Sequence, residues 1–150
     1  MSAVFVDTPV LLAAFDDAAP ERRARAREWL GLCWQNRCGR LSSQVLHEFY
    51  ANARRRFASA IAAGDARAEV RRYQLWKPWL VDQATVETAW AVESRYDIGY
   101  WQAMKVAAAQ HMGCRWLLSE ELPHEQRFEQ LCVVNPYVAG PGTVQTEARP

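Results

Sequence analysis

The sequence lacks the features that would assign it to a membrane, a secretory route or a strongly charged surface. Basic side chains exceed acidic ones by one, so the net charge of +1 creates no overall field that recruits nucleic acid. No apolar run approaches the roughly 20 residues of a membrane-spanning helix. No basic segment with a small-residue cleavage site follows Met1. We therefore expect a cytoplasmic protein with no membrane contact, in which local clusters of charge make any contact with nucleic acid.

Cysteine and histidine give no metal-binding pattern. Among the four cysteines only Cys33 and Cys38 are close in sequence, and no second close pair completes a zinc site. The histidines, His47, His111 and His124, are dispersed along the chain. We expect buried or idle thiols and structural or surface imidazoles.

The apolar runs that are present predict an α/β fold. The first run, Ala3–Val6, does not alternate with polar residues, which is typical of a strand covered on both faces of a parallel sheet. Helical patterns separate it from later runs, and right-handed crossovers then require a three-layer α/β/α sandwich with a mainly parallel, five-stranded central sheet. The other predicted strands cover residues 40–42, 79–81, 115–118 and 132–134, and the predicted helices about 8–15, 20–35, 43–57, 64–76, 84–95 and 101–112. We predict one domain over residues 1–138 and a disordered tail over 139–150.

Acidic residues follow several of these predicted strands. Asp7 ends the first strand, Glu120 and Glu121 follow the 115–118 strand, and Glu48 lies on the helix after the 40–42 strand. Adjacent parallel strands would bring these acids into one crevice, where their mutual repulsion raises pKa values and costs stability. Mg²⁺ or Mn²⁺ would remove that repulsion and suits phosphodiester cleavage. The alternative is that these acids only cap helices or end strands.

Four segments of the chain together resemble the PIN domain, in the form found in VapC toxins of bacterial toxin–antitoxin pairs. The resemblance extends from about Val4 to Tyr137. It is carried by residues 5–8, 41–50, 106–122 and 133–137, which include the motifs FVDT, LSSQVLHEFY and CRWLLSEE. It implies Mg²⁺-dependent endoribonuclease activity on RNA, a homodimer, and neutralisation by a small antitoxin protein. It also implies that Asp7 and Glu48 bind the metal, with Glu121 as a third catalytic acid and Glu120 as a reserve ligand.

Three positions depart from the family pattern. Pro9 stands where the family has Asn, Gln102 where it has Asp, and Glu121 where it has a shorter Asp. The Gln102 change matters most, because a neutral amide replaces a carboxylate at the first turn of a helix. We therefore expect weak or lost cleavage activity. The alternative is a non-catalytic PIN domain that binds RNA or a protein partner.

Lys105 stands one turn after Gln102, where the family carries an aliphatic residue. One hypothesis is that its ammonium approaches Asp7, Glu48 or Glu121 and partly replaces the missing cation. The alternative is that the side chain extends into solvent. Candidate phosphate contacts come from five arginines: Arg22, Arg23, Arg54, Arg55 and Arg56.

Overall fold

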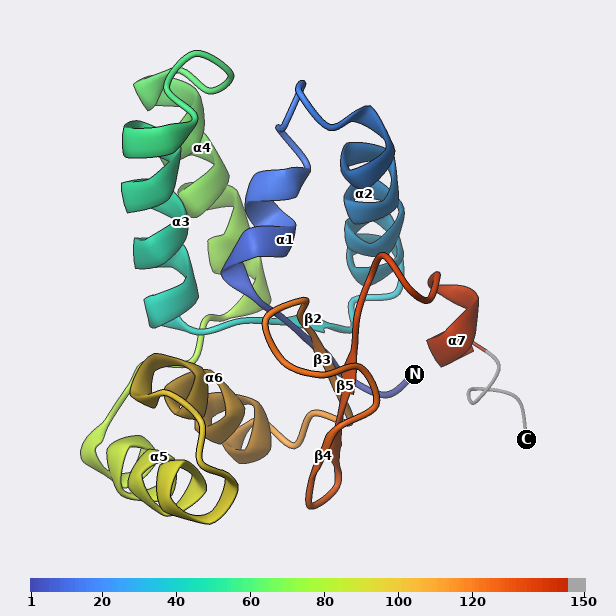
Figure 1. The fold of residues 1–150 in the computed structure, drawn as a ribbon. Helices are drawn as coiled ribbons and strands as arrows, with labels where there is room; N and C mark the ends of the chain where they lie inside the picture. Colours follow the sequence, from blue (N-terminus) through green and yellow to red (C-terminus); the bar gives the residue numbers. More distant parts are fainter. Residues whose placement is uncertain (146–150) are drawn as a thin grey trace.

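The computed structural model describes residues 1–145 and contains one central sheet with helices on both of its faces (Figure 1). The strands are β1 (Val4–Val6), β2 (Gly39–Arg40), β3 (Trp116–Leu118), β4 (Arg127–Phe128) and β5 (Leu131–Val134). They lie in the order β2-β1-β3-β5-β4, and every pairing is parallel except that of β4 with β5. All residues of β1, β3 and β5 are buried, as expected for strands covered on both faces. The predicted fold class is confirmed.

Two groups of helices enclose this sheet (Figure 1). The helices α1 to α4 lie on one side, and α5 and α6 pack together on the other. The bounds are α1 (Thr8–Ala13), α2 (Pro20–Gln35), α3 (Ser43–Arg56), α4 (Ala63–Arg72), the 3-10 helix η1 (Tyr73–Trp76), α5 (Gln83–Tyr96), α6 (Tyr100–His111) and α7 (Gly142–Gln145). None of them, within the described residues, has the length and apolar character needed to cross a bilayer.

The predicted strand at 79–81 is wrong. Within this segment only Trp79 forms a bridge, an isolated parallel one with Ser42 just after β2, and Leu80 is 74% exposed. An apolar run read without its neighbours cannot show that one of its side chains points to water. The fifth strand is instead β4, a two-residue strand that forms an antiparallel hairpin with β5. Its exposed Arg127 gives it no apolar signature in the sequence.

The predicted disorder of the tail is wrong for residues 139–145. Helix α7 lies in this segment, Val144 is 2% exposed, and the Ala139 carbonyl accepts a 3.1 Å hydrogen bond from Trp29 Nε1. One buried valine and one backbone acceptor order the segment, although its apolar content is low. The rest of the predicted tail, 146–150, lies outside the described residues.

Candidate active site

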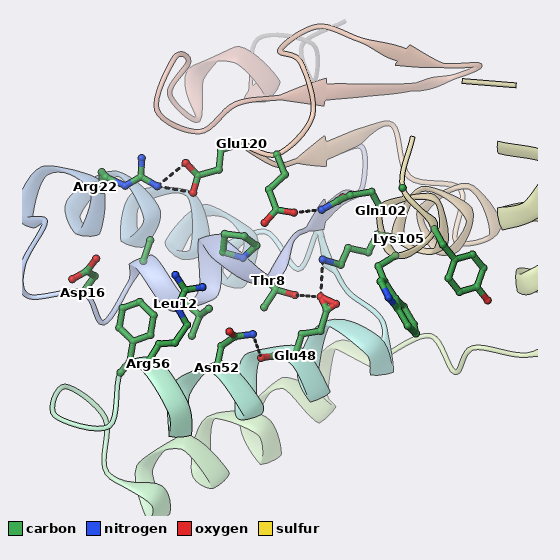
Figure 2. Close-up of a pocket in the computed structure, with 17 residues that line it drawn as sticks. Thr8, Leu12, Asp16, Arg22, Glu48, Asn52, Arg56, Gln102, Lys105 and Glu120 are labelled. Carbon is green, nitrogen blue, oxygen red and sulfur yellow. Dashed lines mark hydrogen bonds and ion pairs between the residues drawn. The ribbon is translucent and has the colours of Figure 1, made fainter. Parts of the chain in front are cut away.

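A cavity of about 620 Å³ opens where β1 and β3 end (Figure 2). The pairing of Val6 with Leu118 brings the ends of these two strands together, so the residues that follow them are neighbours. Helices α1, α3 and α6 supply the other walls of the cavity. The topology therefore gathers side chains that are more than one hundred residues apart in the chain.

Asp7 adjoins the cavity residue Thr8 in the chain and is completely buried. It caps α1, because its Oδ1 accepts a 2.8 Å hydrogen bond from the Thr8 backbone N–H. Its Oδ2 accepts a 2.8 Å hydrogen bond from the Ser119 hydroxyl. A buried carboxylate needs such partners, and here each of its oxygens has one.

Lys105 supplies the positive charge that faces Asp7. Its Nζ lies 2.7 Å from Asp7 Oδ1 and 2.8 Å from Glu48 Oε1, and its side chain is 4% exposed. Burial alone would lower the pKa of this ammonium, but the charges and hydrogen bonds of Asp7 and Glu48 outweigh it, so the pKa is raised and Lys105 is charged. The alternative in which Lys105 extends into solvent is wrong.

Glu48 links the buried pair to the cavity. Its Oε1 accepts a 3.3 Å hydrogen bond from the Thr8 hydroxyl in addition to the contact with Lys105, and its Oε2 accepts one of 3.2 Å from Gln44 Nε2. The side chain is 31% exposed, so this carboxylate borders the open cavity. Helix α3 holds both Gln44 and Glu48, one turn apart.

Gln102 and Glu121 pair with each other at the edge of the cavity. Gln102 Nε2 donates a hydrogen bond to Glu121 Oε2. Among the described residues, Gln102 Oε1 is buried without a hydrogen-bond partner. Loss of water contact, followed by the negative charge of Asp7, raises the pKa of the Glu121 carboxyl above its ordinary value. The neutral Gln102 amide therefore satisfies one oxygen of Glu121 without balancing the charge of that carboxylate.

Glu120 is held away from the other acids (Figure 2). Both of its carboxylate oxygens accept hydrogen bonds from Arg22 Nη2, at 2.5 and 2.6 Å. The Arg22 guanidinium also lies 3.9 Å from the centre of the Tyr137 ring. Glu120, the predicted reserve ligand, and Arg22, a predicted phosphate contact, are therefore paired with each other.

The remaining predicted arginines divide between the cavity and the surface. Arg56 lines the cavity together with Arg22, whereas Arg23, Arg54 and Arg55 do not. Arg23 pairs with Asp17, and Arg54 and Arg55 lie in the exposed last turn of α3. The structure thus brings two of the five arginines to the site.

Thr8, Gln44 and Ser119 complete the site and were not predicted as site residues. Each donates a hydrogen bond to Asp7 or Glu48. All three lie in the motifs that carry the family resemblance, which was the available signal. Pro9 lines the cavity, as a residue that contributes no backbone N–H.

The side chains as arranged do not fit a resident divalent metal. Within residues 1–145 no group of three or more His, Cys, Asp and Glu side chains is placed to hold a metal ion. The Lys105 ammonium lies between the two carboxylates that the family pattern assigns to the metal. A metal ion at these two acids would have to displace that ammonium.

Comparison with known proteins identifies the family. The family model of the PIN domain matches residues 4–122, and the chain belongs to that family. Among solved structures, the fold is similar to that of VapC20 from Mycobacterium tuberculosis, a toxin that cleaves the sarcin–ricin loop. The TM-score is 0.57 at 20% sequence identity, with 77% of this chain and 87% of VapC20 covered. The comparison with curated proteins gives no match.

Proposed function

We propose that this chain is a VapC-like PIN domain directed at RNA, in which metal-dependent endoribonuclease cleavage is weak or lost. The family and the fold support the RNA substrate. One observation carries the loss of activity: Lys105 Nζ lies within 2.8 Å of both Asp7 and Glu48. In this proposal the ammonium takes the place that a divalent ion would hold.

The charges explain why the metal would bind poorly. A metal ion bound to the two acids would displace the Lys105 side chain. That cationic side chain would then have to leave a site where it is only 4% exposed. Gln102 offers a neutral oxygen in place of a carboxylate, so the cation gains less Coulomb energy in return. Glu121 and Glu120 would be the remaining acids, and both already have partners.

The second candidate function is a non-catalytic PIN domain that binds RNA or a protein partner. The observation that favours it is that both carboxylate oxygens of Asp7 already have partners, in Thr8, Ser119 and Lys105. Under either candidate we propose a cytoplasmic homodimer with a small antitoxin as partner, on the strength of the family alone.

Calorimetric titration with Mg²⁺ and Mn²⁺ tests the proposal. The wild-type chain should show no binding below millimolar metal, and the double variant Gln102→Asp, Lys105→Ile should bind at least tenfold more tightly. Adding Asp7→Asn to the double variant should remove that gain. Micromolar binding of metal by the wild-type chain would contradict the proposal, as would unchanged affinity in the double variant.

RNA cleavage and RNA binding separate the two candidates. Single-stranded and structured RNA are incubated with the wild-type chain, the double variant and an Asp7→Asn control, and binding is followed by fluorescence anisotropy. Slow metal-dependent cleavage that Asp7→Asn abolishes indicates an impaired nuclease. RNA bound without cleavage indicates the non-catalytic domain with RNA as its ligand. No RNA binding by any of the three proteins would contradict the proposed RNA substrate.

A further inference from the structure

A second cavity, of about 610 Å³, lies beside β2 and apart from the acidic centre. The end of α2, the turn before β2, the 3-10 helix η1 and the end of α6 form its walls. It shares no lining residue with the active-site cavity. Neither the PIN-domain site nor the proposed function uses it.

Positive charge surrounds this cavity without compensation. Three cations, Arg37, Arg40 and Lys77, line it, and no carboxylate does. Arg40 Nη1 donates hydrogen bonds to the carbonyls of Arg37 (3.1 Å) and Gly39 (2.9 Å), which fixes the guanidinium at the cavity. In the described part of the chain, the side chains of Arg37 and Lys77 have no ion pair or hydrogen bond. Such a concave cationic surface attracts anions.

Aromatic rings form the apolar wall beside these cations. The Trp76 ring covers Gly39 so closely that a Cβ on Gly39 would lie 2.4 Å from its nearest ring atom. Trp34 lines the same cavity, with its ring centre 5.1 Å from that of Trp76. Leu75, at the rim, is 76% exposed. The cavity therefore places apolar side chains, with Leu75 the most exposed of them, next to three cations.

Two of the cations occupy unfavourable backbone positions. Arg37 has a φ of 52° and Lys77 a φ of 51°, both in the left-handed region where glycine is the least strained residue. Local backbone preference therefore does not explain these side chains. These positive φ values also allow a test, because glycine at either position removes the charge and relieves the backbone strain.

We propose that this cavity binds a nucleoside phosphate, either as a free nucleotide or as one unit of an RNA strand. The phosphate contacts Arg37, Arg40 and Lys77, because guanidinium and ammonium groups form charge-assisted hydrogen bonds with phosphate oxygens. The base packs against the exposed Leu75 side chain at the cavity, because Arg72 already lies over the Trp34 ring, 4.4 Å from its centre. This site is independent of Lys105 and the acidic centre.

Calorimetric titration of the full chain with ADP, with inorganic phosphate and with a short single-stranded oligoribonucleotide tests the inference. The double variant Arg37→Gly, Lys77→Gly should bind at least tenfold more weakly, with a melting temperature equal to or above that of the wild type. The matched control is Glu129→Gly, which makes the same backbone change at a φ of 58° and away from this cavity. It should bind like the wild type.

The three probes distinguish the sources of the ligand. ADP binding tighter than phosphate binding, and lost in the double variant, supports a free nucleotide. Binding of the oligoribonucleotide alone, again lost in the double variant, supports a unit of an RNA strand. The inference is overturned if phosphate binds as tightly as ADP, if no probe binds, or if the double variant binds like the wild type. Metal titration of the double variant should equal that of the wild type, so failure here is separable from failure at the acidic centre.

Discussion

Lys105 Nζ lies 2.7 Å from Asp7 Oδ1, in a pair whose side chains are 4% and 0% exposed. Removing both charges from water is costly, and direct contact offsets that cost only while both partners are present. The pair also fastens α6 to the junction between β1 and α1. The ion pair therefore stabilises the fold and also balances charge at the candidate site.

Replacing Lys105 with isoleucine should lower the free energy of unfolding by about 3–5 kcal/mol, because it leaves the buried Asp7 carboxylate without its cation. Urea denaturation at neutral pH without metal measures the loss. Adding Asp7→Asn should restore part of it, since the uncompensated charge is then gone. A double variant whose loss equals the sum of the two single losses would contradict the coupling.

Replacing Ser119 with alanine should cost about 1.5–3 kcal/mol, because its buried hydroxyl donates to a charged carboxylate. The same hydroxyl oxygen accepts from the Glu121 backbone N–H at 3.2 Å, so the turn after β3 also loses a contact. Thermal or urea unfolding measures the change. Ser94→Ala, on the exposed face of α5, is the control and should be nearly neutral. Equal losses at both positions would argue against a specific role for the Ser119 hydroxyl.

Replacing Gly39 with alanine should destabilise the fold by about 1–3 kcal/mol, because the new methyl group would overlap the Trp76 ring. Gly31→Ala is the matched control, since no atom outside α2 lies within 4 Å of its added Cβ. That change should raise stability by about 0.5–1 kcal/mol through better helix propensity. Gly39→Ala with wild-type stability would show that Trp76 moves aside freely.

Tyr73 should make stability fall at alkaline pH. Burial is the main cause that raises the pKa of its hydroxyl from 10.0 to about 12. A folded-state pKa above the unfolded value gives stability that is complete below pH 10 and is lost as pH rises through 12. Urea denaturation between pH 9 and 12 should show a shallower decline for Tyr73→Phe than for the wild type. An identical decline in Tyr73→Phe and the wild type would contradict the assignment.

Much of the fold follows from local sequence pattern. Unbroken apolar runs identify the strands that are buried on both faces, at Val4–Val6 and Trp116–Leu118. Hairpin strand β4 escaped prediction because it consists of two residues, one of them an exposed arginine. The apolar residues of the 79–81 segment resemble those of a strand, although only Trp79 forms a bridge, and its partner Ser42 lies outside the strands of the sheet.

The sequence by itself determined which residues stand at the positions where the resemblance predicts acids, with Gln102 where a carboxylate is expected, since residue identity and motif spacing are local properties. Tertiary structure alone decided their partners. Lys105 turns inward because β1 and α3 bring Asp7 and Glu48 within reach of one ammonium. Glu120 is paired with Arg22, 98 residues away in the chain. No periodicity spans such a distance, so the pairing of charges is fixed only when the chain folds.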